Sequence, residues 1–267
     1  MPDQGKETAT TPVRNSDHVQ TLVRGLAVIR TFSAQRPELT LSEVAKETDL
    51  TRAAARRFLL TLQELGYVRS DGRYFSLTPR VLELGFAYLS SLSLPEIAQP
   101  HLERLVSEVQ ESASVAVLDD TDVVYVARVA TSRIMRVSIN IGTRFPATVT
   151  SMGRVILAGM KDEEIDSFLD TVPLVPLTKY SITDPAKFRA ELKRTRSQGW
   201  SFVDQELEEG LRSIAVPIRD ASGKVKAAMN ISSHTSRNTL ESSRRNLLPP
   251  LLAAAARMEA ELATISR

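Results

Sequence analysis

The sequence predicts an α+β protein in which an N-terminal winged helix-turn-helix is joined by a linker helix to a domain with a mainly antiparallel sheet. Two observations predict this fold. Residues 40–79 follow the order helix, turn, helix and hairpin, and the later sequence mixes helices and strands without strict strand–helix alternation. The 267 residues are enough for two domains. We expect a winged helix at 18–79, a linker helix at 80–95 and a second domain at 96–267.

The first predicted helix spans residues 18–34. Residues 1–17, before it, are polar and have almost nothing to bury, which predicts a disordered tail. In the helix, apolar side chains recur at spacings of three and four, which predicts a buried stripe. Its members are Val19, Leu22, Leu26, Ile29 and Phe32. We expect this stripe to pack under the next two helices and complete a three-helix core.

Two short helices follow, with a turn at 48–50 between them. Thr40 is a favourable N-cap, and Glu43 three residues later completes a capping box. Thr51 caps the second helix. That helix has its own apolar stripe, which must be buried: Ala55, Phe58, Leu59, Leu62 and Leu65.

The opposite face of the second helix carries small residues and arginines. Such a face can approach a major groove closely, and its guanidinium groups can reach phosphates or guanine edges. Gly66 ends the helix, and Asp71-Gly72 predicts a tight turn between strands at 67–70 and 73–77. The candidate DNA contacts are Thr40, Ser42, Thr51, Arg52, Ala53, Arg56, Arg57, Thr61 and Arg73.

The local charge agrees with a DNA-binding role. Residues 51–80 contain six basic and two acidic side chains, a net charge of +4, whereas the whole chain carries only +2. Positive charge concentrated in one segment is the electrostatic pattern of a nucleic-acid site. The alternative is an ordinary pair of helices and a hairpin with a solvated arginine face.

The linker helix is unusually apolar, since residues 78–94 leave little polar surface. It packs either against the same helix of a second chain or against its own domain, and the sequence leaves both open. In the second domain we expect helices at 97–113, 147–160, 161–170, 184–198 and 239–264, with a loop at 142–146. The expected strands are 114–118, 123–129, 135–141, 200–203, 213–218 and 225–232.

Composition excludes several classes of site. The absence of cysteine excludes disulfides, thiolate metal sites and a cysteine nucleophile. The three histidines, His18, His101 and His234, do not cluster at ligand spacing, so we expect no metal and no cofactor. No long apolar run or signal core is present, which predicts a cytoplasmic protein without membrane contact.

This order of elements resembles that of the IclR family of bacterial transcription regulators, and the resemblance runs from about residue 18 to 265. The stretches that carry it are VRGLAVIRTF, LTLSEVAKETDLTRAAARRFLLTLQELGYV, GTRFPATVTSMGRVILA and GLRSIAVPIRDASGKVKAAMNIS. The wording GTRFP-x-x-x-TSMGR is especially similar to the subgroup that regulates β-ketoadipate-pathway genes of aromatic catabolism. The resemblance implies a GAF-like effector domain that binds small organic or aromatic acids.

Matching the family pattern to this chain implies a set of effector contacts. They are Thr143, Arg144, Phe145, Thr150, Ser151, Met152, Gly153, Asp204, Glu206, Ser213, Pro217, Asn230 and Ser232. Strand alternation independently places Asn230 and Ser232 on one face. A carboxylate ligand needs an arginine or several backbone N–H groups, which the helix N-terminus near Gly153 could supply. Arg144 is the favoured cation, and its rivals are Arg133, Arg136 and Arg154.

The expected function is therefore a ligand-responsive transcription regulator and not an enzyme. A homodimer, or a dimer of dimers, would present two recognition helices to successive major-groove faces of double-stranded operator DNA. One alternative is an enzyme that processes a small acid, in which a Ser-His-Asp arrangement would have to use His101 or His234. The other is a DNA-binding scaffold without a ligand.

Overall fold

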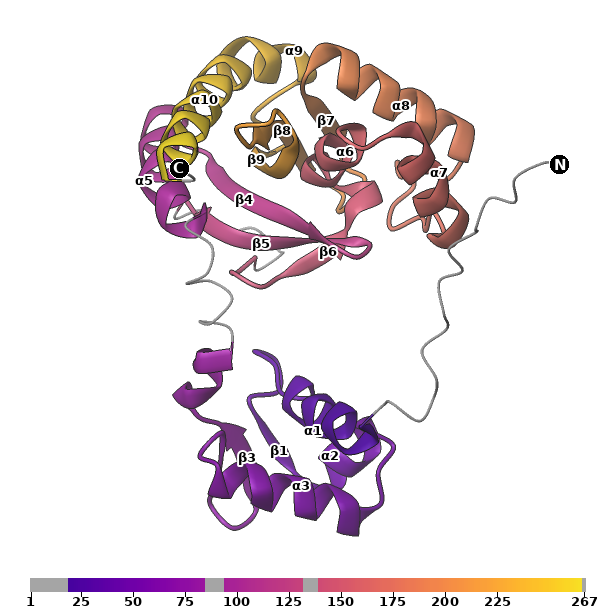
Figure 1. Cartoon of the computed structure of the whole chain (residues 1–267), viewed down its shortest axis with the longest axis vertical. Coiled ribbons are helices and arrows are strands. Elements are labelled where there is room, and N and C mark those ends of the chain that lie inside the picture. Colours follow the sequence, from indigo (N-terminus) through magenta and orange to yellow (C-terminus); the bar gives the residue numbers. More distant parts are fainter. Residues whose placement is uncertain (1–18, 85–93, 132–138, 266–267) are drawn as a thin grey trace, which may run out of the picture. The chain divides into compact units, whose positions relative to one another are not determined.

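The computed structural model of the protein describes residues 19–84, 94–131 and 139–265 (Figure 1). The chain divides into two compact units, residues 1–88 and 89–267, and each has its own hydrophobic core. The division falls inside the segment expected to be the linker helix. The expected tail at 1–17 lies outside the described residues.

The first unit is a winged helix-turn-helix, as expected. Its elements are α1 (Gln20–Arg30), β1 (Glu38–Thr40), α2 (Leu41–Glu47), α3 (Arg52–Glu64), β2 (Val68–Ser70) and β3 (Tyr74–Leu77). The strands form an antiparallel sheet in the order β1-β3-β2. The capping box of α2 is present: the backbone N–H and hydroxyl of Thr40 donate to Glu43 Oε2 at 2.8 and 2.7 Å.

The first helix corrects one expectation. It ends at Arg30, and Val19, Leu22 and Leu26 are exposed rather than buried, at 66%, 63% and 48%. Only the end of α1 enters the core, where Val28 is fully buried. The spacing rule identified a real apolar face, but the side chains in the first two turns of that face are exposed. In α3 the expectation fails only at Leu65, which is half exposed.

The expected linker helix begins differently. Pro79–Val81 form a 3₁₀ turn, capped by Thr78 Oγ1, which accepts from the Arg80 N–H at 3.3 Å, and residues 82–84 are helical. Residues 85–93 lie outside the described part of the chain. The two alternatives for what the linker helix packs against concern these residues.

The second unit has the α+β architecture that the sequence predicts. Its helices are α5 (Leu94–Val109), α6 (Ser151–Ala158), α7 (Asp162–Thr171), α8 (Pro185–Gln198), α9 (Leu240–Ser242) and α10 (Leu248–Ile265). Its strands are β4 (Ser112–Asp119), β5 (Asp122–Val129), β6 (Arg144–Pro146), β7 (Ser201–Asp204), β8 (Leu211–Arg219) and β9 (Val225–His234). Every neighbouring pair in the sheet order β6-β5-β4-β9-β8-β7 is antiparallel.

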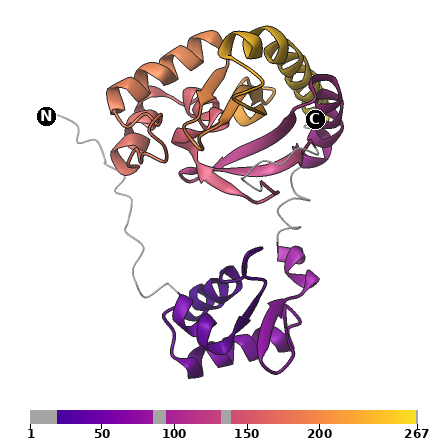
Figure 2. The same cartoon turned by 180° about the vertical axis from the view of Figure 1, so that it is seen from behind.

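Strand alternation gives this sheet two buried faces, each with its own core. The helices α5 and α10 lie side by side against one face, where Val115, Val216 and Met229 belong to one apolar cluster (Figures 1 and 2). Helix α6 packs on the other face, which includes Ala116 and Ala228, and α8 packs on α6; side chains of α7 and α8 join the same apolar cluster. The polar side chains of interest lie on this second face.

Several expectations in this unit are corrected. The helix expected at 97–113 spans Leu94–Val109, and residues 112–113 belong to β4. Residues 144–146, expected in a loop, form the edge strand β6 and pair with β5. The helix expected from 147 starts with a 3₁₀ turn and becomes α-helical at Ser151, because Thr150 Oγ1 accepts from Gly153 N–H and caps it. Of the expected strand 135–141, residues 139–141 are not a strand, and the rest lies outside the described residues.

The C-terminal helix expected at 239–264 is present but interrupted. A five-residue π-helical stretch, Ser243–Leu247, separates α9 from α10. Within the described ranges, no helix combines the length and apolar character needed to cross a bilayer.

Candidate effector cavity and nucleic-acid interface

The outward face of α3 is cationic, and its arginines are exposed. Arg52, Arg56 and Arg57 are exposed, and none of them has an ion pair or a side-chain hydrogen bond within the described chain. Thr40 is half-buried, and its hydroxyl donates a hydrogen bond to Glu43. The other predicted contacts of this region are exposed: Ser42, Thr51, Ala53, Thr61 and Arg73. Flexible, unpaired guanidinium groups on one helix face are free to contact phosphates or base edges.

The wing has a rigid tip. Asp71 Oδ1 accepts from the N–H groups of Tyr74 at 2.7 Å and Arg73 at 2.9 Å, and these bonds hold the pKa of Asp71 below its usual value. Gly72 has a φ of 97°, a conformation that side chains resist. The Arg73 guanidinium lies 5.2 Å from the centroid of the Tyr74 ring. The tip therefore presents Arg73 on a fixed backbone.

A cavity, here called the effector cavity, lies between the N-terminal end of α6 and the face of the sheet that α6 covers. Its walls are Tyr125, Ile139, Val149, Thr150, Ser151, Val203, Leu207, Leu211, Ser213, Asn230 and Ser232. Five of the predicted contacts meet here: Thr150, Ser151, Ser213, Asn230 and Ser232. The cavity has a volume of only about 20 Å³. That is room for about one water molecule.

The polar side of the cavity is a connected network. Ser151 Oγ and Ser213 Oγ are 2.6 Å apart, which joins α6 to β8. Asn230 Nδ2 donates to Ser213 Oγ at 2.9 Å and to Ser232 Oγ at 3.1 Å. Asn230 Oδ1 is buried and has no hydrogen-bond partner among the described residues. A buried amide oxygen without a donor is an acceptor site for an incoming hydroxyl or water.

A β-bulge brings an arginine to the same face. In β5, Tyr125 pairs with Ala116 and Ala127 pairs with Val115, so Val126 is the extra residue. The extra residue reverses the alternation, which puts Arg128 on the same face as Tyr125. Arg128 Nη1 donates to Ser114 Oγ at 3.1 Å.

Arg128 is a half-buried cation that lies close to the network in strand register, although it is not itself one of the cavity's wall residues. Ser114, its partner, lies directly opposite Asn230 in the β4–β9 pair. Arg128 Nε is buried without a hydrogen-bond partner in the described structure, and burial lowers the pKa of Arg128. Burial also raises the pKa of Tyr125 to about 12, so its phenol is neutral at pH 7 and can donate a hydrogen bond.

Arg128 and the apolar walls of the cavity were not predicted from the sequence. Simple alternation counted from Tyr125 assigns Arg128 to the opposite face, and only the bulge corrects it. One signal was available, because the small polar residues Ser112 and Ser114 alternate in β4 as Asn230 and Ser232 do in β9, and these strands pair.

Arg144, the cation favoured from the sequence, lies elsewhere. It sits on edge strand β6, 40% exposed in its side chain, and its guanidinium contacts Asp119 Oδ2 at 2.5 Å and Asp122 Oδ2 at 3.1 Å. These contacts raise the pKa of Arg144, the bond to Asp119 most of all. Arg144 thus ties β6 to the β4–β5 turn and is not part of the cavity wall. Its rivals Arg133 and Arg136 lie outside the described residues.

Arg154 and Glu206 form a buried ion pair. They are 1% and 6% exposed, and Arg154 Nη2 donates to Glu206 Oε2 at 2.5 Å. Glu206 Oε2 also accepts from Ile182 N–H at 3.2 Å, and the guanidinium lies 5.6 Å from the Phe188 ring centroid. The pair fastens α6 to the segment after β7, directly beside cavity residue Leu207.

The remaining predicted contacts are structural in position or face another site. Asp204 accepts two hydrogen bonds from Arg212, of 2.8 and 3.1 Å. Gly153 packs so tightly on the preceding 3₁₀ turn that a Cβ would lie 2.0 Å from the Ala147 oxygen, and its N–H is taken by the Thr150 cap. Pro217 lines a different cavity. Three more predicted contacts are not part of the effector-cavity wall: Thr143, Phe145 and Met152.

The described histidines do not form a catalytic group with the network. His101 Nε2 lies 3.0 Å from Glu261 Oε2, and His234 Nδ1 lies 2.8 Å from Ser236 Oγ. Within residues 19–84, 94–131 and 139–265, no three side chains of the metal-binding types gather into a site.

Comparison with known proteins gives consistent matches along both units. Residues 21–72 match the model "IclR helix-turn-helix domain", and residues 86–260 match "Bacterial transcriptional regulator IclR C-terminal". The Pca regulon regulatory protein of Pseudomonas putida is 47% identical over 239 residues, which cover 89% of this chain and 82% of the relative.

Solved structures match as well. A transcriptional regulator from Rhodococcus sp. RHA1 is 56% identical, with a TM-score of 0.85, and the match covers 93% of this chain and all of the other. An IclR homologue from Microbacterium hydrocarbonoxydans, in complex with 4-hydroxybenzoate, is 27% identical with a TM-score of 0.81, over 91% of this chain and 98% of the other.

Proposed function

Because this chain belongs to the IclR family of bacterial transcriptional regulators, we propose that it controls aromatic-catabolic genes of the β-ketoadipate pathway in response to a small aromatic acid. The similarity to the Pca regulon protein supports the pathway, and the neighbour that holds 4-hydroxybenzoate supports the class of effector. The acid binds in the effector cavity, and DNA binds to α3 and the wing.

One observation carries the effector assignment: two buried polar groups of opposite character lack partners on the same face of the sheet. Arg128 Nε is a cationic donor and Asn230 Oδ1 is an acceptor. A hydroxylated aromatic acid supplies the complement of both, a carboxylate for Arg128 and a hydroxyl for Asn230. The apolar walls Val149, Val203 and Leu207 accommodate the ring. We therefore replace Arg144 by Arg128 as the carboxylate partner.

The small volume of the cavity implies that the acid changes the protein on entry. About 20 Å³ does not hold an aromatic ring, so part of the cavity wall must move outward when the acid enters. Of the wall residues, Leu207 lies in the loop that joins β7 to β8, and the Glu206–Arg154 pair fastens this loop to α6. A ligand shifts an equilibrium only when it binds two states with different affinity, and an open and a closed cavity are two such states.

The DNA-binding part of the proposal rests on the unpaired arginines. Arg52, Arg56 and Arg57 on α3 contact the major groove, and Arg73 contacts the backbone from the wing. A homodimer, or a dimer of such dimers, binds two half-sites about one helical turn apart. We propose that the protein is cytoplasmic, needs no cofactor and catalyses no reaction. The placement of His101 and His234, each paired away from the cavity network, supports the last point.

A mobility-shift titration on the region upstream of the protein's own gene tests the proposal. Protocatechuate, β-ketoadipate, muconate and 4-hydroxybenzoate are each titrated against the wild type and Arg128→Gln. We expect at least one acid to change DNA affinity of the wild type, and Arg128→Gln to raise the acid concentration needed by at least tenfold.

The matched control is Arg104→Gln, which removes an exposed arginine from α5. It should leave both curves unchanged. Operator binding that none of the four acids alters would favour the scaffold alternative, and turnover of any acid would favour the enzyme.

A further inference from the structure

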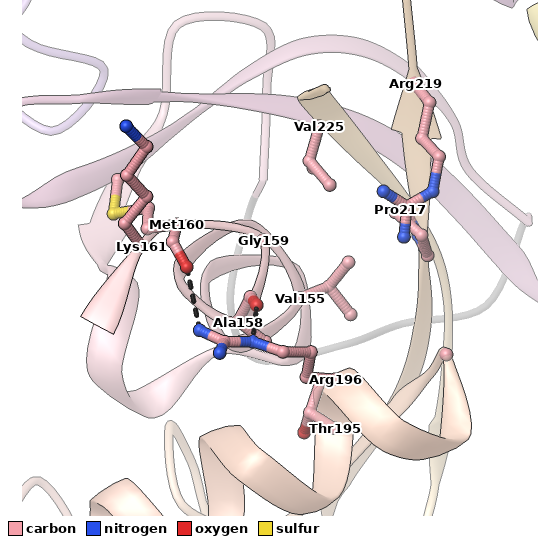
Figure 3. Close-up of a pocket in the computed structure, with 11 residues that line it drawn as sticks. Val155, Ala158, Gly159, Met160, Lys161, Thr195, Arg196, Pro217, Arg219 and Val225 are labelled. Carbon is pink, nitrogen blue, oxygen red and sulfur yellow. Dashed lines mark hydrogen bonds between the residues drawn. The ribbon is translucent and has the colours of Figure 1, made fainter. Parts of the chain in front are cut away.

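A second cavity, here called the α6–α8 cavity, lies at the other end of α6. It has a volume of about 380 Å³ and is formed by the end of α6, by α8 and by the facing parts of β8 and β9 (Figure 3). Its walls are Val155, Ala158, Gly159, Met160, Lys161, Thr195, Arg196, Gly199, Pro217, Arg219 and Val225. It shares no wall residue with the effector cavity.

The interior of this cavity is apolar. Val155 and Ala158 contribute from α6, and Pro217 and Val225 from the strands. Val155 and Val225 point into the space between the helix and the sheet in Figure 3. This wall suits a planar or branched hydrocarbon body rather than a fully hydrated ion.

The charged wall residues are all cations. Lys161 has no ion pair within the described residues, and Arg219 donates from Nη1 to the Gly223 oxygen at 3.0 Å without a carboxylate on its guanidinium. Arg196 is committed to the protein, since it donates to Ala158 O and Met160 O at 2.7 Å each.

Carboxylates that touch these residues do not cancel the excess charge. Asp162 pairs with Arg196 at 2.8 Å. Glu259 accepts from the backbone N–H of Arg219 at 2.7 Å, and Glu164 accepts from the backbone N–H of Lys161 at 2.8 Å, so neither carboxylate is bonded to the charged end of the side chain. Two cations, Lys161 and Arg219, thus remain for an anion at the rim.

A buried hydroxyl in the same wall also lacks a partner. Thr195 is 2% exposed, and its Oγ1 has no hydrogen bond within the described chain. Buried hydroxyls are normally satisfied, so an orphan in the wall of a cavity indicates a polar atom that the cavity admits. The apolar walls favour a hydrocarbon body, the two cations favour an anionic group, and the unpaired hydroxyl favours a further polar atom on the ligand.

We propose that the α6–α8 cavity is a second binding site for a small carboxylic acid with an apolar body. Lys161 or Arg219, which lie on opposite sides of the cavity in Figure 3, binds the carboxylate. The hydrocarbon part lies on Val155 and Val225, and Thr195 Oγ1 bonds a polar atom of the ligand or a water that it carries. The site is separate from the proposed effector cavity, and α6 contributes one end to each. Pro217, predicted from the sequence as an effector contact, belongs here.

Isothermal titration of the full-length protein with benzoate tests the inference. The wild type should bind two benzoates per chain. Lys161→Gln/Arg219→Gln should weaken benzoate binding in the α6–α8 cavity by at least tenfold. It should leave the second benzoate unaffected, because Lys161 and Arg219 do not line the effector cavity. Thr195→Val, which replaces the hydroxyl by a methyl group of similar size, should weaken the same site by a smaller factor. Neutral benzamide should not bind there.

Arg104→Gln is the matched control and should retain both sites. Near-ultraviolet circular dichroism confirms that each variant is folded. The inference is overturned if the folded wild type binds one benzoate per chain and Lys161→Gln/Arg219→Gln binds it equally well. If Arg128→Gln leaves both affinities unchanged while the cavity variant loses one, the second site stands and the proposed effector chemistry fails.

Discussion

The buried Arg154–Glu206 pair allows a sharp test of how the effector domain is held together. Replacing Glu206 by Gln removes the negative charge but keeps an oxygen that can accept from Ile182 N–H. The guanidinium, 1% exposed, then has no counter-charge. Breaking one partner of a buried pair costs about 3–5 kcal/mol. We expect about 3 kcal/mol of lost unfolding free energy for Glu206→Gln, since one hydrogen bond survives.

Two comparisons isolate the charge. Arg154→Met/Glu206→Leu removes both charges and should recover most of the loss, because apolar residues of similar volume replace buried pairs at little cost. Arg144→Gln breaks a pair whose arginine side chain is 40% exposed. It should cost less than about 1 kcal/mol, because solvent screens that pair.

Urea unfolding followed by fluorescence measures these differences. The single tryptophan, Trp200, packs against the core on the α5–α10 face of the sheet, so its emission reports the effector domain alone. A loss below about 1 kcal/mol for Glu206→Gln would refute the reasoning. So would a double variant that is no more stable than the single one.

Four further predictions follow from the contacts described. Arg56→Ala and Arg57→Ala should each weaken DNA binding and flatten its salt dependence by about one unit in a fluorescence-anisotropy titration; unchanged slopes in both would reject the docking of α3. Arg144→Ala should leave the effector dose–response unchanged, although Arg144 is the cation that the sequence favours, because its guanidinium holds two carboxylates outside the cavity; a shifted curve would restore it as a ligand contact. Gly153→Ala should cost more than about 3 kcal/mol in thermal unfolding, because its Cβ would meet backbone at 2.0 Å; a near-neutral change would show that α6 can shift. Burial raises the pKa of Glu111, so the folded state binds the proton of this carboxyl more tightly than the unfolded state does. The unfolding free energy contributed by this group therefore rises as the pH falls through the raised pKa, and Glu111→Gln should flatten that part of the pH–stability curve. Equal slopes for the wild type and Glu111→Gln would contradict this prediction.

The sequence was most informative where structure depends on local signals. Thr40 and Thr51 cap their helices as predicted, and Asp184 with Pro185 starts α8, because caps and turns act over three or four residues. The fold class also followed from the order of elements. Val19 and Leu22 show the limit of this approach, since periodicity identifies an apolar face but not what covers it.

The candidate site was harder to predict because it depends on pairing between distant strands. Asn230 and Ser232 were assigned to one face from alternation alone, and they line the cavity. Arg128 was out of reach, since one extra residue at Val126 reverses the alternation and no turn signal announces it. Arg144 shows the converse, because nothing in its surrounding sequence reveals that Asp119 and Asp122 neutralise it across two strands.

The unpaired arginines of α3 have a consequence for how the protein meets a polyanion. Residues 51–80 carry +4 within a chain of +2, so all the other residues together carry −2. A duplex therefore attracts one short segment and repels the remainder, which selects productive encounters before any base is read. Association should be fast at low ionic strength and lose its orientational preference as the Debye length shrinks, even though the chain is almost neutral in total.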